Sequence, residues 1–150
     1  MPRIADGRCV CLLPKTVDHA RQLKIIENEI AAMAGQAVIL GTVAPDHAQK
    51  DKVPARLKAD RDAECNEFLG KCDDFQAEIA KETAACHFTY AELEENDADL
   101  KKLQTWLEEI RKLDFYYATL AAPAGERLRD CKSLPEASAK RVFDAHDENK

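Results

Sequence analysis

The sequence lacks the features by which membrane and secreted proteins are most easily identified. No window of the 150 residues approaches the run of about 18 apolar residues that a membrane-spanning helix needs. Residues 1–15 contain neither a basic start followed by a long apolar stretch nor a small-residue cleavage site. We therefore expect a cytoplasmic protein that does not associate with a membrane.

Familiar catalytic and cofactor-binding motifs are also missing. The chain contains no G-x-S-x-G elbow, no P-loop, no G-x-G-x-x-G turn, no H-E-x-x-H and no C-x-x-C. Because these motifs carry the familiar catalytic and cofactor-binding chemistry, we predict no enzymatic activity and no cofactor. A structural zinc site needs paired ligands at spacings such as C-x-x-C, so we also predict no metal.

An excess of positive charge is the third feature that the chain lacks. Its 22 Lys and Arg residues are outnumbered by 28 Asp and Glu residues, which gives a formal net charge of −6. This balance argues against a nucleic-acid footprint that covers the whole domain. Binding to DNA would have to depend on a local basic patch.

The composition that is present, 45% apolar and 33% charged, is typical of a soluble globular protein, and the length suits a single domain over residues 1–150. The first part, residues 1–44, predicts a β-α-β unit. Short apolar runs with β-branched residues, at residues 8–13 and 37–43, have the character of buried strands. Between them Thr16 is a good helix N-cap and Gly35 a good helix stop.

A polar loop at residues 44–53 leads into a helical portion, residues 54–147. The apolar spacing predicts one long helix over residues 54–85 and a second over residues 89–114, which begins with a T-x-x-E capping box. The short connection makes them an antiparallel αα-hairpin. Two short helices complete an α+β, mostly α, fold, the second with Pro135 in its first turn.

The six cysteines have different interpretations according to their place in the chain. Cys65, Cys72, Ile79 and Cys86 follow one another at intervals of seven residues and share one helical stripe, so we interpret the three cysteines as core residues. Cys9 and Cys11 share one face of the expected strand, and packing is the simpler interpretation there. A redox or soft-metal site at Cys9 and Cys11 stays open as the alternative.

Basic residues gather in two places. An ordinary solvated surface explains both, and a site for an oxyanion or a phosphate backbone is the alternative. The two clusters consist of Lys50, Lys52, Arg56, Lys58 and Arg61, and of Arg127, Arg129, Lys140 and Arg141.

Several stretches together resemble the N-terminal region of ChrB-type chromate resistance proteins. They are CLLP (11–14), MAGQAVIL (33–40), DRDAECNEF (60–68), FTYAELEEN (88–96), DLKKLQTWLEEIRKLDFY (99–116) and KRVF (140–143). The resemblance implies a cytoplasmic, chromate-responsive regulator or accessory factor of an efflux operon. Under this resemblance Arg56, Arg61 and Lys58 are the expected oxyanion contacts, because guanidinium groups present paired donors to a tetrahedral dianion.

The resemblance also implies a partial ferredoxin-like arrangement of the β-α-β unit. The family pattern contains a further strand and helix ahead of the matching segment, and a C-terminal domain, neither of which this sequence contains. We therefore expect the exposed strand edge to drive formation of a homo-oligomer.

Two other functions remain open at this point. The first is a helical module that acts only by docking to another protein. The second is a thiol reductant that uses Cys9 and Cys11 on chromate itself.

Overall fold

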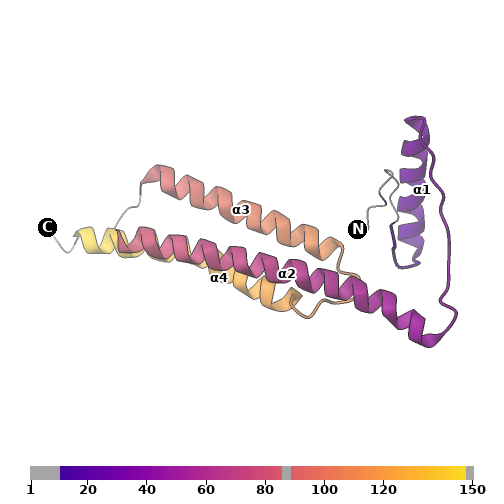
Figure 1. Cartoon of the computed structure of the whole chain (residues 1–150). Helices are drawn as coiled ribbons and strands as arrows, with labels where there is room; N and C mark the ends of the chain where they lie inside the picture. Colours follow the sequence, from indigo (N-terminus) through magenta and orange to yellow (C-terminus); the bar gives the residue numbers. More distant parts are fainter. Residues whose placement is uncertain (1–10, 86–88, 148–150) are drawn as a thin grey trace. The chain divides into compact units, whose positions relative to one another are not determined.

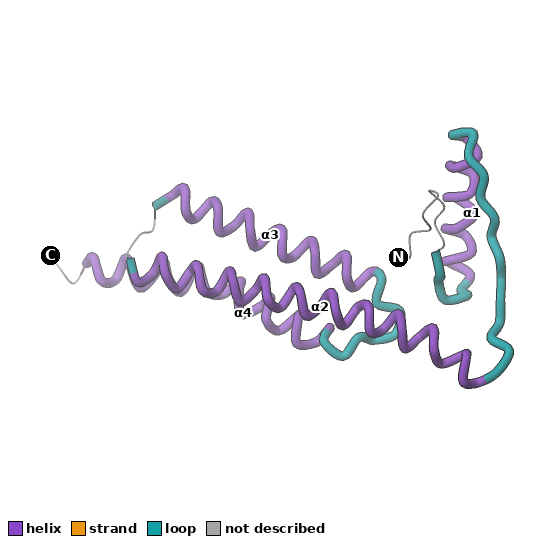
Figure 2. The backbone as a smooth tube through the Cα atoms, in the orientation of Figure 1, coloured by secondary structure: helices purple, strands orange, loops and turns teal. Residues whose placement is uncertain are grey.

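A computed structural model describes residues 11–85 and 89–147 of the chain (Figure 1). It contains α1 (Val17–Ala32), α2 (His47–Ala84), α3 (Tyr90–Lys112) and α4 (Ala121–Asp147). The described residues form helices, turns and loops without a strand, so the predicted α+β fold is wrong and this part of the chain is all-helical (Figure 2). The chain divides into two compact units, residues 1–50 and 51–150.

Helix α1 forms in the first unit, where its capping residues predict it. The Thr16 side chain accepts a hydrogen bond of 3.1 Å from the backbone N–H of His19. At the other end the N–H of Gly35 donates to the carbonyl of Ile30 at 2.8 Å, the pairing of a Schellman motif. Ala34, and not the glycine, takes the left-handed conformation, with a φ of 59°. The helix therefore ends slightly earlier than the glycine suggests.

The two predicted strands are not observed. Residues 11–13 and 37–43 have no regular secondary structure, and residues 8–10 lie outside the described part of the chain. Val38 and Leu40 are 81% and 83% exposed. Strand propensity reflects the fit to a neighbouring, half-buried strand more than an intrinsic backbone preference, and no neighbour exists among the described residues. These residues therefore offer no strand edge for the expected oligomer.

Helix α2 begins earlier than predicted and takes up much of the predicted loop at residues 44–53. Asp46 Oδ1 accepts a hydrogen bond of 2.8 Å from the N–H of Gln49, which caps the first turn of the helix. Pro54 lies inside α2. Proline removes one backbone hydrogen bond from a helix, and here the helix continues through it.

Helices α2, α3 and α4 surround the core of the second unit (Figure 1). Side-chain contacts pair Phe68 with Trp106 and Glu82 with Asn96, so α3 runs antiparallel to α2, as the predicted hairpin requires. Apolar burial of this kind contributes about 1.5–3 kcal/mol for each large side chain. The buried core residues are Cys65, Phe68, Cys72, Phe75, Ile79, Leu103, Leu107, Ile110, Ala124, Leu128 and Cys131.

Helix α4 replaces the two predicted C-terminal helices. It is continuous through Pro135, although the sequence predicts the start of a separate helix at this residue. Two contacts with α2 give its direction. The backbone N–H of Leu120, just before α4, donates to Asp62 at 2.8 Å, and Cys131 of α4 lies beside Cys72. Helix α4 therefore runs parallel to α2 and antiparallel to α3, and it closes a three-helix bundle.

The capping box predicted at the start of α3 is confirmed. Thr89 Oγ1 accepts from the N–H of Glu92 at 3.3 Å, while Glu92 Oε2 accepts from the N–H of Thr89 at 2.7 Å. We expect Thr89→Ala to lower the free energy of unfolding by about 1 kcal/mol, because the first turn loses a hydrogen-bond acceptor. Urea titration followed by circular dichroism measures this loss. Thr105→Ala, an exposed site inside the same helix, is the matched control, and an equal loss in both variants would contradict the role of the cap.

Candidate functional site

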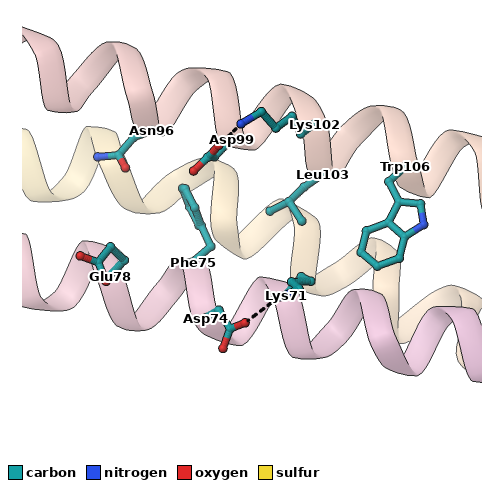
Figure 3. Close-up of a pocket in the computed structure, with 9 residues that line it drawn as sticks. All are labelled: Lys71, Asp74, Phe75, Glu78, Asn96, Asp99, Lys102, Leu103 and Trp106. Carbon is teal, nitrogen blue, oxygen red and sulfur yellow. Dashed lines mark hydrogen bonds and ion pairs between the residues drawn. The ribbon is translucent and has the colours of Figure 1, made fainter.

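A groove of about 560 Å³ lies between α2 and α3 (Figure 3). Phe75 from α2 and Leu103 and Trp106 from α3 supply its apolar surface. Charged pairs border it: Lys71 with Asp74 at 3.4 Å, and Lys102 with Asp99 at 2.6 Å. The residues that line it are Lys71, Asp74, Phe75, Glu78, Asn96, Asp99, Lys102, Leu103 and Trp106.

One end of the groove contains a buried polar residue, Asn96, which is 5% exposed. Its Nδ2 donates a hydrogen bond of 2.8 Å to Glu82 Oε2 on α2. Because an unpaired buried amide is costly, this bond helps to fix how α2 and α3 align. No signal in the sequence marks Asn96, since an asparagine among acidic residues resembles an ordinary helix surface.

Lys102, on the rim of the groove, is poorly suited to act as a general base. The hydrogen bond from Lys102 to Asp99, together with the charge of that carboxylate, raises the pKa of the Lys102 amine. A lysine that stays protonated cannot act as a general base. The groove can therefore bind an apolar or amphipathic group, and the charged pairs act as its rim.

A second pocket, of about 360 Å³, lies where the end of α3 meets the beginning of α4. Arg111, Arg129 and Lys132 bring three positive charges to it, and Glu126 brings one negative charge. The complete lining is Arg111, Ala122, Gly125, Glu126, Leu128, Arg129 and Lys132. Of these, only Arg129 belongs to a basic cluster that is evident in the sequence.

The predicted oxyanion contacts lie elsewhere, on α2, and the structure does not bring them together. The Arg56 side chain is 80% exposed and pairs with Asp60 at 3.0 Å. Five residues of helix separate it from Arg61, which places the two arginines about 140° apart around the axis. Lys58, which lies between the two arginines in the sequence, has a half-buried side chain.

Arg61 is the most enclosed of these three residues, with a side chain only 17% exposed. Its Nη1 lies 2.9 Å from Glu64 Oε2, within ion-pair distance. The alignment is not that of a hydrogen bond, so this buried nitrogen has no hydrogen-bond partner. Arg61 therefore points at its own helix neighbour and does not line either of the pockets described above.

The cysteines divide into an exposed site and a core cluster. Cys11 is exposed, while Cys9 lies outside the described residues, as do Cys86 and His87. Cys65 and Cys72 are fully buried, which confirms the predicted core stripe at these two positions.

Cys131 joins Cys72 in the core from the neighbouring helix α4. Its Sγ donates to the Cys72 carbonyl at 3.8 Å. Burial raises the pKa of Cys65 and Cys131, and it raises the pKa of Cys72 to about 12. Since the thiolate is the reactive form of cysteine, these three thiols are protected from chemistry.

Within residues 11–85 and 89–147, no helix has the length and apolar character that crossing a membrane requires. In those same ranges no three His, Cys, Asp or Glu side chains gather in a way that could hold a metal ion.

Comparison with known proteins identifies the family. Residues 3–149 match the family described as "Protein ChrB, N-terminal", which confirms the resemblance in the sequence. Searches of curated proteins and of solved structures gave no match. The match covers nearly the whole chain, so this protein belongs to the ChrB N-terminal family and is associated with chromate resistance.

Proposed function

We propose that this chain is a non-enzymatic regulatory or accessory factor of chromate resistance that responds to chromate and takes part in the control of an efflux operon in the cytoplasm. The family match over residues 3–149 carries this proposal. The cationic pocket between α3 and α4 supports it, because clustered guanidinium and ammonium groups are the side chains that bind a tetrahedral dianion.

The expected result is that chromate binds the purified chain more tightly than sulfate does at the same ionic strength. Isothermal titration calorimetry measures both affinities directly. The fluorescence emission of Trp106, the single tryptophan, reports on changes in the bundle. Its ring lines the groove, and the centroids of the Trp106 and Phe68 rings are 5.6 Å apart. N-acetyltryptophanamide titrated in parallel corrects for the light that chromate itself absorbs.

Equal affinity for chromate and sulfate, or no binding of chromate, would contradict this proposal. A chain without any chromate response would favour the second candidate, a helical module that docks to another protein. The observation that favours this candidate is the apolar surface of the groove between α2 and α3.

A thiol reductant is the third candidate, and a separate measurement tests it. A reductant would lower chromate absorbance over time, and a Cys9→Ser/Cys11→Ser variant would not. The exposed position of Cys11 permits access by chromate. The buried thiols of Cys65, Cys72 and Cys131 contribute little to such a reaction, because burial keeps them protonated.

A further inference from the structure

The pocket at the junction of α3 and α4 has a charge opposite to that of the chain as a whole. The full sequence has a net charge of −6, whereas the pocket lining contains Arg111, Arg129 and Lys132 against the single carboxylate of Glu126. All three cations are exposed, so solvent screens much of their mutual repulsion, and an anion placed among them would be attracted to each of them. This local excess of positive charge therefore favours an anion as the ligand.

Several cations on the surface of the bundle have close partners, whereas those in the pocket are poorly paired. Lys101 and Lys102 are held by Asp97 and Asp99 at 2.7 and 2.6 Å. Arg129 lies 3.9 Å from Glu126, the outer limit of an ion pair. Within the part of the chain that the structure describes, no ion pair or side-chain hydrogen bond joins Arg111 or Lys132 to a protein group.

Gly125 allows the Arg111 guanidinium to lie directly against α4. A Cβ atom built at Gly125 would be 2.5 Å from Arg111 Nη2, too close for the side chain to keep its place. Glycine is otherwise unfavourable inside a helix, since it has more conformational freedom to lose than alanine. The glycine thus creates the space that lets an arginine from α3 join two cations of α4.

The three cations suit one class of ligand. A guanidinium group can donate two parallel hydrogen bonds to the oxygens of an oxyanion, and an ammonium group adds a compact charge with three donors. Two arginines and one lysine from two helices can therefore surround a small tetrahedral dianion from more than one side.

We propose that the pocket formed by Arg111, Arg129 and Lys132 binds a divalent tetrahedral oxyanion and thereby joins the end of α3 to α4. That this oxyanion is chromate rests on the proposed function; the site itself rests on the pocket. A ligand held by both helices binds only the folded bundle, so it raises the melting temperature in proportion to the logarithm of its concentration.

Calorimetry on the full chain with chromate, sulfate and phosphate in turn, at fixed ionic strength, tests the site. We expect Arg111→Gln, Arg129→Gln and Lys132→Gln each to weaken binding of the preferred anion by about tenfold, the effect of losing one charge-assisted hydrogen bond. Arg21→Gln and Lys81→Gln, which remove a surface charge elsewhere, should leave the affinity within about twofold of wild type because distant exposed charges are screened.

Gly125→Ala tests the same site without removal of a charge. The added methyl group displaces Arg111 Nη2, so the affinity for the oxyanion should fall. Alanine favours the helix, so the melting temperature without ligand should rise by about 2–4 °C. A variant that binds less because it is unfolded would melt at a lower temperature, and the two effects are therefore separable.

The outcomes distinguish this inference from the proposed function. Tight binding of chromate that survives all four pocket substitutions would overturn the site while leaving the proposed function standing, and its loss in Arg56→Gln/Arg61→Gln would move the site to α2. Binding of sulfate or phosphate but not chromate, lost in the pocket variants, would support the site and overturn the chromate-responsive function. No binding of any of the three anions would overturn both.

Discussion

Leu107→Ala should lower the free energy of unfolding of the helical bundle by about 2–5 kcal/mol. Leu107 is 1% exposed and lies in the core with Ile110 and Leu103 on the same helix. Its truncation removes buried methyl groups and leaves a cavity that a bundle of three helices cannot fully close. Urea unfolding followed by Trp106 fluorescence reports on this bundle directly, since Trp106 is next to Leu107 in α3.

Leu113→Ala is the matched control for this experiment. The same substitution is made six residues further along, at the end of α3, where the side chain is 52% exposed. The expected loss there is about 0.5 kcal/mol or less, as for most surface substitutions. Similar losses at both positions would mean that α3 does not bury the face on which Leu107 lies.

Alkaline pH should destabilise the protein through the buried thiol of Cys72. Burial is the main cause that raises the pKa of this thiol from 9.0 to about 12. Between these two values the unfolded chain loses the thiol proton while the folded protein retains it. The unfolded state therefore binds fewer protons, and stability falls as pH rises. The Cys72 contribution is fully present below pH 9.0 and disappears between pH 9.0 and about 12.

Within that window Cys72 should contribute a slope of about −1.4 kcal/mol per pH unit to the free energy of unfolding. A series of urea titrations between pH 8 and about pH 11 measures this slope. In Cys72→Ala the slope should be shallower by that amount, even though the loss of the side chain lowers stability at every pH. All other groups are common to both proteins, so their effect cancels in the difference.

Cys11→Ala is the control for the alkaline slope, because it removes an exposed thiol outside the core. Its slope should equal that of the wild type. If Cys72→Ala and the wild type lose stability in parallel above pH 9.0, the Cys72 thiol has access to water in the folded protein, and the buried contact with Cys131 is absent.

Local sequence signals were sufficient to predict much of the helical part. Thr16 and Thr89 both cap the helices they were expected to cap, because an N-cap needs only a side chain and the N–H groups two or three residues ahead. The apolar stripe through Cys65 and Cys72 was correctly assigned to the core for the same reason. Helical periodicity is a property of neighbouring turns and needs no information about the rest of the fold.

Two predictions whose outcome depends on the rest of the fold were wrong. The run at residues 37–43 has strand-like residues but no neighbouring strand among the described residues, and a strand is stable only in a sheet. The sequence predicts the start of a helix at Pro135, although α4 continues through it. The contacts on both sides of a proline can compensate for one missing backbone hydrogen bond, and those contacts cannot be predicted from local sequence.

The sequence by itself determined the family, the helical hairpin and the residues that cap its second helix, because each depends on residues close together in the chain. Only the tertiary structure brought Arg111 of α3 over Gly125 of α4, and Cys131 beside Cys72, 59 residues away. Pockets and buried thiol pairs form where faces of different helices meet. Which faces meet is decided by the three-helix bundle as a whole, since the choice depends on how all three apolar stripes are buried together.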